Sequence, residues 1–157
     1  MSELPVASDE IVRKWRQITA ISPYSRELGL ELQSIQPDWC VIKVPYDERL
    51  VGNPRTQVLH GGVITALLDS CYGLAIFVRM NQLRAMATLD LRIDYLKPAT
   101  PGRHVLGGAV CYKLGTELAF VRGCAYHDSP DDPIATSVAI FMFTGGPVLS
   151  LEQAVAR

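Results

Sequence analysis

The sequence predicts an α+β fold in which one antiparallel β-sheet wraps around a long central helix. Residues 61–79 form a helical segment that is apolar nearly all round, and a helix that is apolar on every side is normally buried. Four long strand candidates follow this segment, and their short connections favour antiparallel neighbours. A sheet wrapped around the helix is the simplest way to bury it on several sides.

A shorter helix and two strands are predicted before the central helix. Ser8 can cap the first helix, which should end near Ser22-Pro23 because the residue before a proline resists the helical region. Alternating apolar residues indicate the strands, and Pro37 marks the turn between them. These elements are a helix at about 9–22, strands at 29–35 and 39–44, a turn at 36–38 and a loop at 45–58.

The strand candidates after the central helix are separated by segments rich in glycine and proline, which favour turns. The tail at 148–157 is predicted to form a short terminal helix. We therefore expect one domain over 1–157, with its core at about 28–145. The four strand candidates are 85–96, 103–113, 118–127 and 134–143.

The composition indicates an ordinary globular protein. The 157 residues are 48% hydrophobic and 20% charged, and the net charge is -1 with scattered lysines and arginines, so no basic stripe points to nucleic-acid binding. The cysteines have no CxxC spacing, and we expect reduced core thiols in a cytoplasmic protein. They are Cys40, Cys71, Cys111 and Cys124.

The apolar run at 61–78 is long enough to raise the question of a membrane span. Asp69 at its centre argues against one, as do the amphipathic segments on both sides. Residues 1–10 lack a basic region followed by an apolar run, so no secretory signal and no membrane association are expected.

The start of the central helix, His60-Gly61-Gly62, offers hydrogen-bond donors. The first N–H groups of a helix lack partners within the helix, and the helix dipole makes that end positive. Glycine allows a ligand to approach these groups closely. Gly61 can therefore donate to a polarised carbonyl. The alternative is that the glycines only allow close packing.

Asp69, the one carboxylate in the helix, follows Gly61 by eight residues, which is roughly 12 Å along the axis. A carbonyl about 3 Å from the Gly61 N–H cannot also touch Asp69 of the same helix. If both groups act on one substrate, two antiparallel copies of the helix must share each site, as in a two-fold dimer. The alternative is a solvent-facing Asp69.

Two motifs resemble a known enzyme family. Val58-Leu59-His60-Gly61-Gly62, followed by Leu67-Leu68-Asp69, and the segment at 88–99 are similar to hotdog-fold acyl-CoA thioesterases of the phenylacetate-degradation (PaaI) type. The resemblance spans about residues 28–143. It implies the hotdog fold, hydrolysis of acyl-CoA, and a homodimer or homotetramer. It implies no cofactor and no metal.

The resemblance also implies roles for single residues. Asp69 would attack the thioester or activate water, the Gly61 N–H would polarise the carbonyl, and His60 would shape the site. Asn53 would be a loop asparagine near the nucleophile. Thr88 would hold the water, although strand alternation makes Leu89, Leu91, Ile93 and Tyr95 face the helix, so only a bulge or the dimer edge brings Thr88 to the site.

Further residues are candidates for substrate contact. The predicted acyl pocket is apolar, so uncharged medium-chain or aryl acyl groups are the expected substrates. Gly73, one turn beyond Asp69, either leaves room for the acyl group or allows close packing of the helix. Lys97 and Arg103 either bind coenzyme A phosphates or are solvated strand ends. The other candidates are Val58, Leu59, Gly62, Ala66 and Tyr72.

Three residues are interpreted as structural. His104 and His127 are interpreted as structural histidines and Cys71 as a core thiol.

Two other functions compete with thioester hydrolysis. One is that of a hotdog hydratase or dehydratase, and the other is that of a non-catalytic acyl-CoA-binding or regulatory module. Fold alone does not decide between them.

Overall fold

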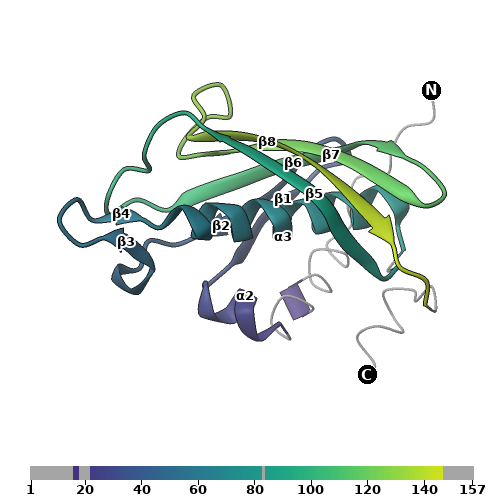
Figure 1. The fold of residues 1–157 in the computed structure, drawn as a ribbon, viewed down its shortest axis with the longest axis horizontal. Coiled ribbons are helices and arrows are strands. Elements are labelled where there is room, and N and C mark those ends of the chain that lie inside the picture. The colour runs from purple at the N-terminus through teal and green to yellow at the C-terminus, as the bar shows by residue number, and fades with distance from the viewer. Residues whose placement is uncertain (1–15, 18–21, 83, 147–157) are drawn as a thin grey trace.

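A computed structural model of the chain describes residues 16–17, 22–82 and 84–146 (Figure 1). One long helix, α3 (Gly61–Met80), lies between a short N-terminal group of elements and four long strands. The elements before α3 are α2 (Pro23–Glu27), β1 (Glu31–Ile35), β2 (Cys40–Val44), the 3-10 helix η1 (Glu48–Leu50), β3 (Val51–Asn53) and β4 (Val58–Leu59). The elements after it are β5 (Met86–Tyr95), β6 (Val105–Leu114), β7 (Leu118–Tyr126) and β8 (Ala135–Phe143).

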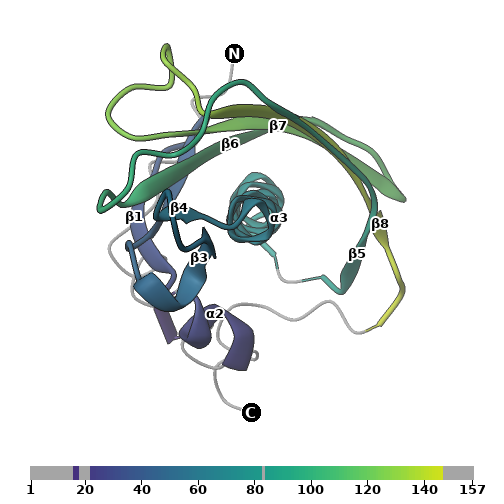
Figure 2. The ribbon, with the colours of Figure 1, turned by 60° about the vertical axis from the view of Figure 1, so that its left-hand side comes forward.

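The main sheet has six strands in the order β1-β2-β6-β7-β8-β5, and every neighbouring pair is antiparallel. Viewed nearly along α3, the sheet curves from β1 over β6 and β7 to β8 and β5, with the helix in its hollow (Figure 2). The predicted fold class is therefore confirmed. β1 and β5 are the edge strands, and β5 follows α3 directly in the chain.

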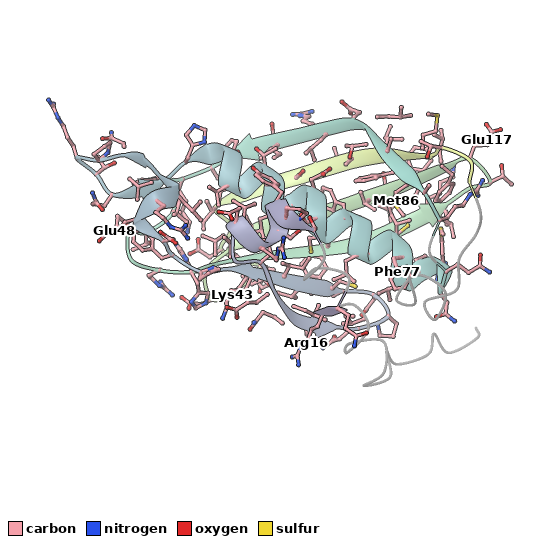
Figure 3. All side chains as sticks on the ribbon, turned by 90° about the horizontal axis from the view of Figure 1, so that it is seen from below. Arg16, Lys43, Glu48, Phe77, Met86 and Glu117 are labelled. Atoms are coloured by element: carbon pink, nitrogen blue, oxygen red, sulfur yellow. The ribbon has the colours of Figure 1, made fainter. Side chains whose placement is uncertain are left out.

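The core forms between α3 and the concave face of the sheet. The fully buried side chains of α3 include Leu67, Leu68 and Phe77. Close approach of helix and sheet requires glycine in β6, because a Cβ at Gly107 would lie 2.9 Å from Leu67 Cγ. Seen from the side opposite to that covered by the sheet, α3 lies in front of the strands, with Phe77 near its end (Figure 3).

The predicted long elements are confirmed, with ends that differ by one or two residues. The segment before β1 was predicted incompletely: α2 begins at Pro23, where a helix was expected to end. Ser22 caps α2, and proline is well tolerated at a first helical position. Most of the helix expected at 9–22, and the terminal helix expected at 148–157, lie outside the described residues.

The loop expected at 45–58 is more ordered than predicted. It contains η1 and the two-stranded sheet of β3 and β4, which pairs Val51 with Leu59. This small hairpin leads directly into the start of α3, and His60 N–H donates to Leu50 O at 2.9 Å. The hairpin therefore fixes the position at which α3 begins.

α3 is long and apolar enough to cross a membrane by length and composition alone. The core helix of a soluble protein has the same length and composition, and 56% of the apolar 18-residue stretch of α3 is buried inside this fold. The apolar composition of α3 is therefore explained by its position in the hollow of the sheet.

One face of α3 is not covered within the chain, although the helix is buried on its other sides as predicted. The half-buried residues recur at helical spacing on that face, because the sheet covers only part of the helix circumference. Asp69 lies on this open face and is half-buried. The residues of the open face are Thr65, Ala66, Asp69, Ser70 and Gly73.

The four cysteines are free and buried, in agreement with the prediction of core thiols. Burial raises the pKa of Cys40 to about 12 and that of Cys124 to about 11. The pKa of Cys71, which is 0% exposed, is also raised well above its usual value by burial. These thiols therefore stay protonated at neutral pH, and the protonated form is a poor nucleophile.

We expect native protein at pH 8 to resist alkylation at Cys40 and Cys71. At pH 8 both thiols stay protonated, because this pH is below their raised pKa values, and burial shields them from the reagent. Peptide mass spectrometry after iodoacetamide treatment should find these two sites unmodified, whereas all four cysteines should react in denaturant. Modification of Cys71 in the native protein at the denatured rate would contradict this packing.

Candidate active site

The start of α3 presents one unused backbone donor. His60 is the N-cap, with φ -61° and ψ 136°, and its Nδ1 accepts the Gly62 N–H at 2.9 Å. The His60 carbonyl accepts the Val63 N–H at 2.9 Å. The Gly61 N–H, at an exposed residue, has no acceptor within the described part of the chain. Gly61, rather than Gly62, is therefore the amide left available to a ligand.

Tyr95 of β5 contacts this helix start. Its hydroxyl donates to the Gly61 carbonyl at 2.7 Å and lies 3.1 Å from Thr65 Oγ1. Thr65 Oγ1 also donates to the Gly61 carbonyl, at 3.3 Å. Strand alternation predicted that Tyr95 faces the helix. It did not predict these hydroxyl contacts, because they depend on the distance between β5 and α3.

Asp69 has a hydroxyl partner. Thr88 Oγ1 donates to Asp69 Oδ1 at 2.7 Å, from β5 across to α3. A bulge lies in β5 between Thr88 and Asp90, where the register with β8 shifts by one residue. A bulge was one of the two features predicted to bring Thr88 to the site, the other being the dimer edge.

The same bulge corrects the predicted alternation of β5. Leu91 and Ile93 pack partly against the core as predicted, but Leu89 is 54% exposed. An extra residue in one strand reverses which side chains face inward, so Thr88 before the bulge and Leu91 after it lie on the helix side. Leu89 belongs to the irregular step between them.

A cleft of about 330 Å³ opens beside Gly61. Val58 and Leu59, both predicted as pocket residues, line it together with Gly61 and Tyr95. Lys97 lies in the wall as well, among Leu96, Pro98 and Ala99. The cleft therefore combines an apolar lining with the free amide at one side. His60 and Gly62 instead line a separate groove of about 610 Å³ against Leu50 and Val51.

Two predicted lining residues of α3 have different environments. Tyr72 is 0% exposed and packs against Gly123 of β7, so it is a core residue, which corrects its assignment to the pocket. Burial also raises the pKa of the Tyr72 hydroxyl. At Gly73, an added Cβ would meet nothing within 4 Å, so no described residue of the protomer packs against it.

Asn53 lies in the exposed hairpin and not beside Asp69 of the same chain. Its Oδ1 accepts the Arg55 N–H at 3.0 Å, and its carbonyl accepts from Gln57 at 2.8 Å. These bonds are typical of an asparagine that shapes a turn. Within one protomer, the structure therefore does not bring Asn53 to the carboxylate.

The two candidate phosphate-binding cations are paired with carboxylates. Lys97 forms an ion pair with Asp132, and Arg103 Nη2 lies 2.6 Å from Asp128 Oδ1. The Arg103 guanidinium lowers the pKa of Asp128. Lys97 is 40% and Arg103 41% exposed, so each remains partly accessible despite its partner.

The structural reading of His127 agrees with its contacts. Its Nε2 accepts the Thr100 N–H at 2.9 Å, and its Nδ1 lies 2.7 Å from the His104 carbonyl. Because Nε2 accepts, Nδ1 carries the proton and donates to that carbonyl. Both ring nitrogens therefore hydrogen-bond to the backbone of the connection between β5 and β6. Among the described residues, no group of three or more His, Cys, Asp or Glu side chains is placed to hold a metal ion.

Residues 56–134 match the model of the thioesterase superfamily, and the chain belongs to this superfamily of thioester hydrolases. YigI of Escherichia coli, a medium/long-chain acyl-CoA thioesterase, is 29% identical over 133 residues, which cover 76% of this chain and 84% of YigI. The order and spacing of the motifs predicted this family correctly.

Solved structures share the fold. A protein from Pseudomonas aeruginosa is 38% identical, with a TM-score of 0.73 over 83% of this chain and 96% of that protein. The Escherichia coli PaaI protein, from the phenylacetic acid degradation operon, has a TM-score of 0.71 at 18% identity, over 85% of this chain and 95% of PaaI. The central helix and curved sheet are thus those of hotdog thioesterases.

Proposed function

We propose that this protein hydrolyses acyl-CoA thioesters to a free acid and coenzyme A, in a site shared between two subunits. The observation that carries the proposal is the Asp69–Thr88 pair on the open face of α3, combined with the unused N–H of Gly61 at the start of the same helix. The YigI name supports acyl-CoA as the substrate class.

The proposed chemistry needs only these groups and water. The Gly61 N–H donates to the thioester oxygen, where negative charge develops as the carbonyl carbon is attacked. Asp69 either takes a proton from the attacking water or attacks the carbon itself. The C–S bond then breaks. When Asp69 acts as base, it passes the proton taken from water to the sulfur, and coenzyme A leaves as a thiol. When Asp69 attacks, the acyl group stays on it as a mixed anhydride; a water then hydrolyses this anhydride to the free acid and Asp69, and the proton released reaches the coenzyme A thiolate.

Thr88 suits either role of Asp69. Its hydroxyl donates to Oδ1 and holds the carboxylate in one orientation, which leaves Oδ2 available to a water or to the substrate carbon. A carboxylate that already accepts one hydrogen bond is fixed with little reorganisation during the reaction. Thr88 therefore acts on the reaction through Asp69.

The distance between the two groups along the helix supports a shared site, if both act on one substrate. Gly61 and Asp69 are roughly 12 Å apart along α3, too far for one carbonyl to reach both. A second copy lying antiparallel over the open face of α3 would bring its Gly61 to this Asp69. The exposed edge strand β5 lies next to that face, and an unpaired strand edge is a natural template for another chain.

Release of free thiol from a panel of acyl-CoAs tests the proposed function. Acetyl-, hexanoyl-, phenylacetyl- and succinyl-CoA sample length, aromaticity and charge, and Asp69→Ala is the control. The cysteines of the protein are buried and should add little background to a thiol reagent. No thiol release above the Asp69→Ala background from any substrate would contradict the proposal.

We expect hexanoyl- and phenylacetyl-CoA to be better substrates than acetyl- or succinyl-CoA. The space beside Gly73 is open, and it lies one turn beyond Asp69 on the same face. Each methylene well placed in an apolar pocket contributes about 1–3 kcal/mol of discrimination. Acetyl- or succinyl-CoA with the highest kcat/KM would overturn this pocket.

Gly73→Val tests whether Gly73 makes the room for the acyl chain. The added side chain meets nothing within the protomer, so the variant should fold. We expect kcat/KM for hexanoyl-CoA to fall by about 10-fold or more, with acetyl-CoA changed far less. An equal loss on both substrates together with loss of the dimer would assign Gly73 to packing between copies.

A further inference from the structure

The peptide group between Gly61 and Gly62 is held at both ends by side chains. Its carbonyl accepts the Tyr95 hydroxyl at 2.7 Å, and its N–H donates to His60 Nδ1 at 2.9 Å. Thr65 Oγ1 adds a weaker contact to the same carbonyl, at 3.3 Å. This peptide plane is thus fixed by two hydrogen bonds, one from Tyr95 of the sheet and one to the N-cap residue of the helix.

The preceding peptide, between His60 and Gly61, is held at its carbonyl only. That carbonyl accepts the Val63 N–H at 2.9 Å, whereas the Gly61 N–H of the same plane is unused within the described residues. Gly61 is thus flanked by two anchored peptide planes. The single free donor of this turn projects from an otherwise fixed backbone.

Such anchoring matters because two successive glycines would otherwise be the most mobile start a helix can have. Glycine populates more backbone conformations than any other residue, and the first turn of a helix tends to fray. A donor stabilises developing charge well only if it is oriented before the reaction begins. The glycines leave room for the substrate, but their mobility must be suppressed by something else.

We propose that Tyr95 is a positioning residue that holds the Gly61 N–H in its donating orientation. This inference rests on the proposed function of Gly61 in polarising the thioester carbonyl. Tyr95 acts through the Gly61 carbonyl and the Gly61–Gly62 peptide, with His60 holding the other end. It also lines the cleft beside Gly61, so its hydroxyl lies where the backbone must be fixed and the substrate must still enter.

Tyr95→Phe removes the hydroxyl and keeps the ring. We expect kcat for the best acyl-CoA to fall about 3- to 10-fold, the range for loss of one hydrogen bond, with KM within about twofold of the wild type. Tyr112→Phe is the matched control, since Tyr112 is 51% exposed against 50% for Tyr95 and lies in the same sheet. Its activity should be unchanged. Thr65→Val keeps the Tyr95–Gly61 bond and should cost less than Tyr95→Phe.

Hydrogen exchange of the Gly62 amide gives a measurement that needs no substrate. In protein labelled with ¹⁵N-glycine, the Gly62 N–H should exchange faster in Tyr95→Phe than in the wild type or in Tyr112→Phe, because the carbonyl of its peptide then keeps only the weaker of its two side-chain bonds, from Thr65. The absence of a signal in Gly62→Ala assigns the resonance among the 12 glycines.

Three results would overturn the role of Tyr95. They are wild-type kcat in Tyr95→Phe, a rise in KM that accounts for the whole loss, and unchanged Gly62 exchange in that variant. Failure of the proposed function looks different, because the wild-type enzyme itself would then release no thiol from any acyl-CoA. The exchange measurement distinguishes a misplaced backbone from an inactive carboxylate, since Asp69 makes no contact with the Gly61–Gly62 peptide.

Discussion

Asp69→Asn is expected to lower kcat/KM for acyl-CoA hydrolysis by at least about 100-fold, the usual cost of losing a general base or nucleophile. The amide neither takes a proton from water nor attacks a thioester. Its shape is that of the carboxylate, and its carbonyl oxygen can accept the Thr88 hydroxyl that now donates to Oδ1 at 2.7 Å. The fold should therefore persist while the reaction is lost. Initial rates of thiol release, with thermal unfolding of both proteins, make the comparison.

Asp90→Asn is the matched control. Asp90 is an exposed carboxylate in the same part of β5, directly after the bulge, and it has no role in the proposed reaction. Its activity should stay within about twofold of the wild type, because isolated surface charges contribute little. Turnover at the wild-type rate by well-folded Asp69→Asn would show that the carboxylate has another function.

The sequence was a good guide to the long elements because their patterns are set by the core. The apolar run that becomes Gly61–Met80 and the four strands after it bury side chains at regular periods, and such periods are visible without a structure. The hairpin of β3 and β4 was not foreseen. Its strands have three and two residues, too few to show any alternation.

The candidate site was predictable in its parts and not in its connections. The motif predicted His60, Gly61 and Asp69 as site residues. The structure adds a capping bond at the first, an unused amide at the second and a hydroxyl partner at the third. Thr88 depended on a bulge, whose position is decided by pairing with β8 and not by the residues of β5 alone. Tyr95 was predicted only to face the helix, since a hydrogen bond between distant segments leaves no periodic trace.

Contacts between distant segments also explain why the sequence assigned Tyr72 to the pocket and the structure places it in the core. On the helix it follows Asp69 by three residues, close enough in angle to be assigned to the same pocket. The boundary between the covered and open faces of α3 falls between them, because β7 approaches at Gly123 and encloses the ring. Helical spacing predicts neighbours, but the edge of the sheet decides which of them are exposed.

Mixing two inactive variants, Asp69→Ala and Gly61→Pro, is expected to restore activity if the site is shared. Proline removes the donor N–H of Gly61, and alanine removes the carboxylate. In a mixed dimer, one site combines the intact Gly61 of one chain with the intact Asp69 of the other, and the second site carries both defects. With random exchange at equal amounts, about one quarter of wild-type activity should return.

The structure favours folding of Gly61→Pro. Gly61 is the first residue of α3, where proline is well tolerated, and His60 has φ -61° and ψ 136°, a conformation suited to the residue before a proline. A Cβ at Gly61 has its nearest neighbour, Tyr95 Oη, at 3.4 Å, an ordinary contact. Gly61→Ala adds the same Cβ but keeps the N–H, and it should retain more activity than Gly61→Pro. Subunit exchange confirmed by native mass spectrometry, without recovered thiol release, would mean that each chain forms its site alone.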